Sequence, residues 1–179
     1  MEFQKSGYLE VEHTADWELE VWAPEIEGLL EEAARGMYQL AGVVFEDKPR
    51  VVRKFNIDIV DPEGQIVAFL SELLFYSEME MIAFDNFNIK KSDTGISAAV
   101  EGAPIKRIEK EIKAVTYHKL EVRQGKRGFE ASIIFDVWFL ADANWGLNEE
   151  VHDGQHFWSK ADKRFRVGNP EELDRKSVV

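Results

Sequence analysis

The segment Trp17-Glu18-Leu19-Glu20-Val21-Trp22, closely followed by a long amphipathic run, decides the fold class of this 179-residue chain. Every second side chain of the segment is apolar, as expected for a strand with one face in a core and the other in solvent. Over residues 26–41 the apolar positions instead repeat at helical spacing, and Gly42 is suited to end that helix. The sequence therefore begins with a strand that leads into a helix with one buried face.

The rest of the chain to residue 137 predicts a second helix and further strands. Apolar residues repeat at helical spacing over residues 66–75, after Asp61-Pro62, a pair that favours the start of a helix. The turn Gln124-Gly125-Lys126-Arg127-Gly128, with alternating residues after it, indicates an antiparallel hairpin. Further strands are predicted over residues 52–59, 84–89, 96–100, 112–122 and 129–137. Because strands and helices do not alternate strictly, we predict an α+β fold with two helices on one face of a mainly antiparallel sheet.

Residues 138–179 differ in character from the rest of the chain. They contain Trp138, Trp145 and Trp158, three of the five tryptophans, among scattered turn formers. Neither strand nor helix periodicity persists there. We therefore predict one domain over residues 1–137 and a C-terminal extension of unknown role over residues 138–179.

Composition and charge limit the class of function. Thirty-four acidic residues against 22 basic ones give a net charge of −12, which disfavours strong direct binding of nucleic acid and favours a hard cation or a basic partner protein. The absence of cysteine excludes disulfides, Cys-ligated zinc, iron–sulfur clusters and thiol catalysis. No apolar run reaches the ~18–20 residues that cross a bilayer, and the N-terminus lacks a signal-peptide pattern, so we expect a cytoplasmic protein without membrane contact.

The four histidines carry no decisive motif by spacing. His13 stands three residues before Asp16, an arrangement more typical of a capped turn than of a functional pair. His118 lies within the strand predicted over residues 112–122. His152 and His156 have the spacing of a helical metal pair, but Gly154 between them disfavours a helix, and surface positions are the better interpretation.

One lysine and two carboxylates stand out among apolar neighbours. Alternation along the predicted strand places Lys113 and Val115 on one face and Ile112 on the other, and a strand lysine is usually a solvated edge residue. Asp136 ends a strongly apolar strand and Glu72 interrupts an apolar helix, where a charge needs a partner, a hydrogen bond or a cation. Glu72 fits a solvated helix edge equally well. Composition and spacing alone indicate an acidic α+β domain suited to binding a cation.

Four segments together resemble the archease family, in order and at fitting intervals over about residues 8–137. They are His13-Thr14-Ala15-Asp16, the helical Leu70-Ser71-Glu72-Leu73-Leu74-Phe75 with Glu80 beyond it, the string Lys113-Ala114-Val115-Thr116-Tyr117-His118, and Ile134-Phe135-Asp136-Val137. The third of these strings is the most specific.

The resemblance implies a non-catalytic protein partner of the RtcB-type RNA-splicing ligase in tRNA splicing. Archease promotes guanylylation of the ligase and its repeated turnover, and family members bind a divalent cation, recorded as calcium. By resemblance the metal ligands are Asp16, Asp136 and Val137. Lys113 is implicated in activation, and we include His13 and Glu72 in the same predicted group.

One departure and two alternatives accompany this prediction. Family chains end at or just after the acidic-aliphatic pair, whereas this one continues, so Val137 has only a backbone oxygen to offer. The first alternative is a chaperone or specificity modulator of an RNA or tRNA methyltransferase. The second is a stand-alone metal-dependent hydrolase built on Asp16, Glu72, Asp136 and His13.

Overall fold

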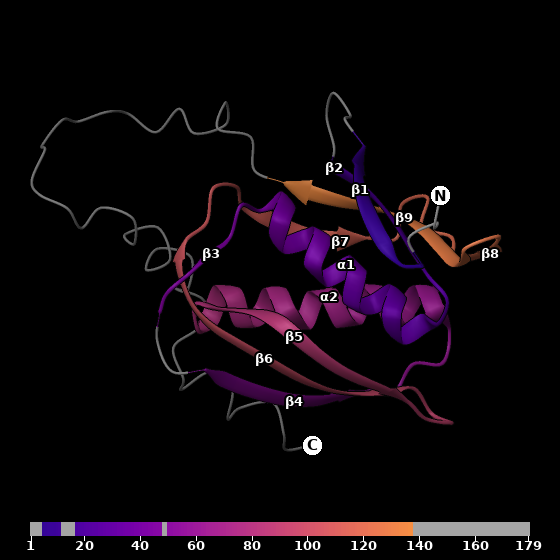
Figure 1. The fold of residues 1–179 in the computed structure, drawn as a ribbon, viewed down its shortest axis with the longest axis horizontal. Helices are drawn as coiled ribbons and strands as arrows, with labels where there is room; N and C mark the ends of the chain where they lie inside the picture. Colours follow the sequence, from indigo (N-terminus) through magenta and orange to yellow (C-terminus); the bar gives the residue numbers. More distant parts are fainter. Residues whose placement is uncertain (1–4, 12–16, 48–49, 138–179) are drawn as a thin grey trace, which may run out of the picture. The chain divides into compact units, whose positions relative to one another are not determined.

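The computed structural model describes residues 5–11, 17–47 and 50–137 of the chain (Figure 1). In chain order its elements are β1 (Gly7–Val11), β2 (Trp17–Ala23), α1 (Ile26–Leu40), β3 (Val44–Phe45), β4 (Val51–Ile57), α2 (Pro62–Met79), β5 (Ile82–Lys91), β6 (Ile96–Arg107), β7 (Ile112–Thr116), β8 (Arg123–Gly125) and β9 (Gly128–Val137). The predicted extension over residues 138–179 lies outside the described residues.

The described strands form two antiparallel sheets. The five-stranded sheet has the order β1-β2-β9-β7, with β8 also paired to β9, and the four-stranded sheet is built on β6, which pairs with β3, β4 and β5. The helices lie between the sheets, since α1 packs against β1, β2 and β5, and α2 against β4, β5 and β7 (Figure 1). The antiparallel α+β class with two helices is confirmed. The strands divide between two sheets because each helix buries apolar side chains toward both sides.

Helix α1 follows the predicted pattern and packs closely on β2. Its apolar positions, among them Leu29, Leu30 and Ala33, are buried. Gly36 faces the strand so tightly that a Cβ there would lie 2.5 Å from the Leu19 side chain. The absence of a side chain at this position therefore sets how near the helix approaches the five-stranded sheet.

Helix α2 starts earlier and ends later than the periodicity predicts. Pro62 occupies its first turn, and the Asp61 carboxylate accepts a hydrogen bond from the Gly64 backbone N–H at 2.6 Å, which caps the helix start. The inner face is formed by Ile66, Phe69 and other buried apolar residues. Apolar residues also occur on its exposed side, so the periodicity of apolar residues does not indicate where the helix ends.

The hairpin before the last strand is confirmed, but the strand predicted over residues 112–122 is too long. Gly125 pairs with Gly128 around a two-residue turn, and Gly128 has φ +102°, a conformation that suits glycine. Strand β7 ends at Thr116. The chain then turns, with Lys119 at φ +56° and Leu120 N–H donating to the Tyr117 carbonyl. His118 consequently lies in an exposed turn and not in a strand.

Candidate functional site at the end of β9

The segment between β6 and β7 is tied to the C-terminal end of α1, and the end of β6 is tied to the chain just after α2. The backbone N–H groups of Glu109 and Lys110 donate to the Ala41 carbonyl at the end of α1, at 2.9 and 3.1 Å. Just after α2, the Met81 carbonyl accepts from Ile105 N–H at 2.7 Å. Neither helix carries a basic residue in its last turn. The negative ends of two helix dipoles are thus directed toward the end of the domain where β7 begins and β9 finishes, which favours a nearby positive charge (Figure 1).

Lys113 is the extra residue of a β-bulge in β7. Ile112 pairs with Val137 and Ala114 pairs with Asp136, so two residues of β7 stand against one of β9. Ile112 and Val115 are both buried, at 3% and 7% exposure. The prediction that they face opposite sides of the strand is wrong, because the inserted residue shifts the phase of the alternation.

The bulge brings Lys113 to the Asp136 carboxylate. Lys113 Nζ lies 3.8 Å from Asp136 Oδ1, and the two side chains are 28% and 56% exposed. Asp136 faces away from the core, since its strand neighbours Phe135 and Val137 are buried. An exposed ion pair of this length adds little to stability. The pair therefore presents an accessible carboxylate beside an ammonium group.

Of the proposed ligands Val137 and Asp16, the structure describes only Val137. The Val137 side chain is buried and the residue pairs with Ile112, so backbone oxygen is the donor it could supply to a cation. Asp16 and His13 lie outside the described residues. The residue after Asp16, Trp17, pairs with Phe135, which shows that β2 and β9 are antiparallel neighbours at this end.

Lys110 is a second cation at this end that sequence reasoning did not single out. Its Nζ lies 4.4 Å from the ring centroid of Trp17, a cation–π contact. The two residues are far apart in the sequence and share no motif. The pairing of β9 with both β2 and β7 brings them together, so no local signal could have predicted the contact.

Glu72 belongs to a different group of side chains. It lies beside Tyr76 on α2; burial raises the pKa of the Tyr76 hydroxyl, and the Glu72 charge raises it further. Arg53 from β4 lies over the Tyr76 ring and pairs with Glu80. The structure therefore brings Lys113 and Asp136 together and places Glu72 with a tyrosine and an arginine.

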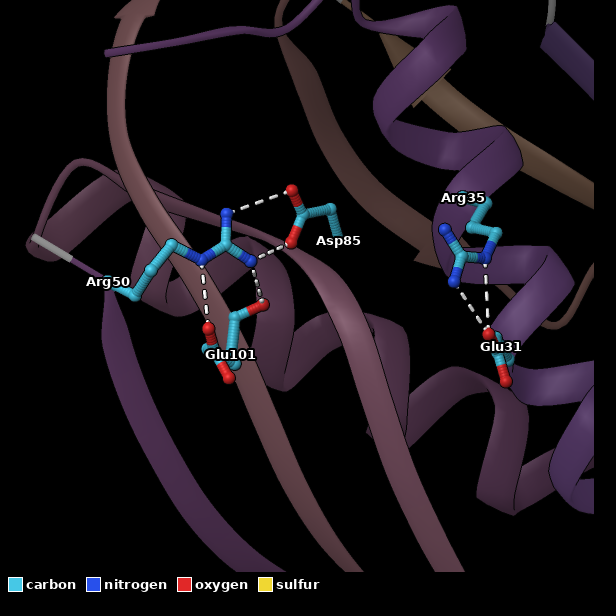
Figure 2. A network of polar contacts seen from close by, with 5 residues as sticks. All are labelled: Glu31, Arg35, Arg50, Asp85 and Glu101. Atoms are coloured by element: carbon cyan, nitrogen blue, oxygen red, sulfur yellow. Dashed lines mark hydrogen bonds and ion pairs between the residues drawn. The ribbon is translucent and has the colours of Figure 1, made fainter. Parts of the chain in front are cut away.

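Another polar network, on the four-stranded sheet, is closed on itself. Arg50 pairs with both Asp85 and Glu101, with an Nε–Oε1 distance of 3.0 Å to Glu101 (Figure 2). Hydrogen bonds to Asp85, and then to Glu101, raise the pKa of the Arg50 guanidinium. Because one guanidinium engages two carboxylates on neighbouring strands, the network links strands and leaves little capacity for a ligand.

The described ranges contain neither a cluster of metal-ligating side chains nor a membrane-spanning helix. No group of three or more His, Asp or Glu side chains in residues 5–11, 17–47 and 50–137 could hold a metal ion. In the same part of the chain, neither helix is long and apolar enough to span a membrane.

Comparisons with known proteins agree on one family. Residues 8–137 match the model of the Archease protein family. Protein archease of Methanosarcina barkeri is 30% identical over 146 residues, covering 76% of this chain and all of the relative. A crystal structure from Thermotoga maritima, described as an archease and possible chaperone, shares 25% identity with a TM-score of 0.56 and covers 70% of this chain and 94% of that one. Protein 1598 of Methanobacterium thermoautotrophicum, 22% identical with a TM-score of 0.57 over 74% of this chain and 99% of that one, has the same fold. The chain belongs to the archease family.

Proposed function

We propose that this protein activates an RtcB-type RNA-splicing ligase in tRNA splicing in the cytoplasm. It promotes guanylylation of the ligase and repeated turnover, and catalyses no reaction of its own. Membership of the archease family supports the proposal. The observation that carries it is the Lys113–Asp136 pair, in which a bulge presents a charged side chain next to an accessible carboxylate at one end of the domain.

The donor chemistry at this end suits a calcium ion. Ca²⁺ takes carboxylate and carbonyl oxygens at about 2.3–2.6 Å, and Asp136 and the Val137 carbonyl are donors of that kind. Asp16, the third ligand we propose, precedes the strand that pairs with β9. The helix ends nearby favour positive charge. When bound, the ion would supply a Lewis-acidic positive charge at the contact with the ligase.

Lys113 and Asp136 have complementary roles in this proposal. The bulge directs the Lys113 ammonium to the outer side of the sheet, where it offers a compact charge to a phosphate or an acidic side chain of the ligase. Asp136 holds that ammonium near 3.8 Å and limits where it can reach. His13 and Glu72 remain proposed activation residues; the position of Glu72 beside Tyr76 assigns it a contact separate from the pair.

The test is a guanylylation assay. The full chain is mixed with the ligase, manganese and labelled GTP, and the covalent ligase–GMP adduct is followed over time. We expect stimulation by the wild-type chain, a large loss with Asp136→Asn, and no loss with Lys90→Met, which removes an exposed lysine from β5. Absence of stimulation by the wild-type chain would refute the proposal.

The same preparation tests the alternatives. The description of the Thermotoga maritima relative as a possible chaperone motivates the first of them. An effect limited to RNA methylation would favour a chaperone or specificity modulator of an RNA or tRNA methyltransferase. Turnover of a substrate by the isolated chain would favour the hydrolase.

A further inference from the structure

One side of α2 exposes two large apolar side chains. The exposed residues of this helix are Ser71, Phe75, Glu78 and Met79, here called the α2 stripe. Phe75 is 51% exposed and Met79 is 55% exposed. They are four residues apart, so they lie next to each other on the same helix face. Single exposed apolar residues are common, but an adjacent aromatic and methionine are typical of protein interfaces.

The charges on this helix have one sign. The sequence of α2 contains Glu63, Glu72 and Glu78 and no lysine or arginine. Arg53 from β4 lies nearby but is paired with Glu80. Glu63 lies in the first turn and accepts a hydrogen bond from Val122 N–H, whereas Glu72 and Glu78 stand three residues before and after Phe75. The two apolar anchors therefore have an acidic border formed by Glu72 and Glu78.

We propose that the α2 stripe is the docking surface for a basic amphipathic segment of the partner protein. Apolar side chains of that segment cover Phe75 and Met79, and its lysines or arginines face the acidic border. A second copy of this chain is a poor occupant, because two chains of net charge −12 repel each other and both stripes are acidic. This inference rests on the proposed function and adds to it the surface that holds the ligase.

The stripe is placed so that one partner can contact it and the Lys113–Asp136 pair together. Met79 lies at the end of α2, and Ile105 N–H binds the Met81 carbonyl just beyond that end. Ile105 lies near the end of β6, the strand that precedes β7 and the Lys113 bulge. Figure 1 shows α2 ending at the same end of the domain as the start of β7 and the end of β9. The apolar anchors Phe75 and Met79 are distinct from Lys113 and Asp136, so substitution can separate docking through the anchors from activation by the pair.

The experiment measures affinity and maximal stimulation independently. The double variant Phe75→Gln, Met79→Gln keeps residues that helices accept and removes both apolar anchors. Leu9→Gln is the matched control, since Leu9 is 56% exposed on β1. Binding of each full-length chain to the ligase is measured by calorimetry at two salt concentrations, and adduct formation is titrated with each chain.

We expect the double variant to weaken binding by about 100-fold, about tenfold for each anchor, and the control to bind like wild type. At saturating concentration the double variant should still stimulate fully, because Lys113 and Asp136 are intact. Glu72→Gln should reduce the salt dependence of binding.

Three outcomes would overturn the inference. If the double variant binds within about threefold of wild type, or the Leu9→Gln control loses as much affinity, the stripe is not the docking surface and the proposed function stands. If the wild-type chain dimerises in light scattering and the double variant does not, the stripe joins copies of this chain. If wild type neither binds nor stimulates the ligase, the proposed function fails and the docking surface fails with it.

Discussion

The bulges in β5 and β7 each insert a charged residue into an antiparallel strand, with different consequences. In β5 the inserted residue is Asp85, and Arg50 joins it to Glu101 (Figure 2). In β7 it is Lys113, which stands 3.8 Å from the exposed Asp136. The first charge is held by a guanidinium that engages two carboxylates, whereas the second lies beside the exposed carboxylate of Asp136. The same backbone irregularity therefore serves in one place to fasten strands and in the other to present a charge.

The largest expected effect follows Asp136→Asn. The substitution keeps the shape of the side chain and removes the charge that a divalent cation needs, so calcium affinity should fall about 100-fold or more and ligase stimulation should fall with it. Calcium binding is measured by calorimetry and stimulation by adduct formation. Unchanged calcium affinity would show that Asp136 is not a ligand.

Lys113→Met should separate two roles of the bulge. Loss of the ammonium should reduce stimulation about tenfold, because the charge offered to the ligase is gone. Calcium affinity should rise about threefold to tenfold, since a positive charge no longer stands beside Asp136. The two assays are read on the same preparation. A parallel fall of both quantities would contradict a separate role for the lysine.

Loss of the ion pairs at the β5 bulge should lower the stability of the protein and leave ligase stimulation unchanged. Arg50→Ala leaves Asp85 and Glu101 without the cation between them and should lower the free energy of unfolding by about 1 kcal/mol, as expected for a partly exposed network. Urea denaturation gives the change, and the guanylylation assay should give wild-type stimulation. Loss of stimulation in the folded variant would place this region in the working surface.

The smallest effect concerns Tyr76 and tests the assignment of Glu72. Because burial and the Glu72 charge raise the pKa of Tyr76 in the folded state, its contribution to stability is present below the ordinary tyrosine pKa and is lost as pH rises through the folded value. Glu72→Gln should move the Tyr76 pKa down toward its ordinary range. NMR titration of ring-labelled tyrosine measures the shift. An unchanged pKa of Tyr76 would contradict the contact assigned to Glu72.

Helix α1 and the last hairpin were predictable because their signals are local. Periodic apolar residues determine α1, and Gly125 and Gly128 determine the hairpin turn. Each of these signals lies within a short stretch of sequence. The division into two sheets was not predictable, since it depends on which distant strands pair. The phase of β7 was mispredicted for the same reason: nothing near Lys113 indicates that Ala114 pairs with Asp136.

The candidate site was predictable only in part. The resemblance supplied the residue set Asp16, Asp136, Val137 and Lys113, but no spacing indicated that Lys113 and Asp136 are in contact. The contact between Lys110 and Trp17 joins residues with no shared motif. Long-range strand pairing, which single-sequence patterns do not encode, decides both contacts.

The supernumerary position of Lys113 has a consequence for how this end of the domain can change. If the residue were deleted, Ile112, Ala114 and Val115 would follow one another in regular alternation, with the two apolar side chains still directed inward. A single codon could thus be lost or regained while the interior of the protein stays as it is. The positive charge at this position can therefore be lost or gained during evolution without changes to the core.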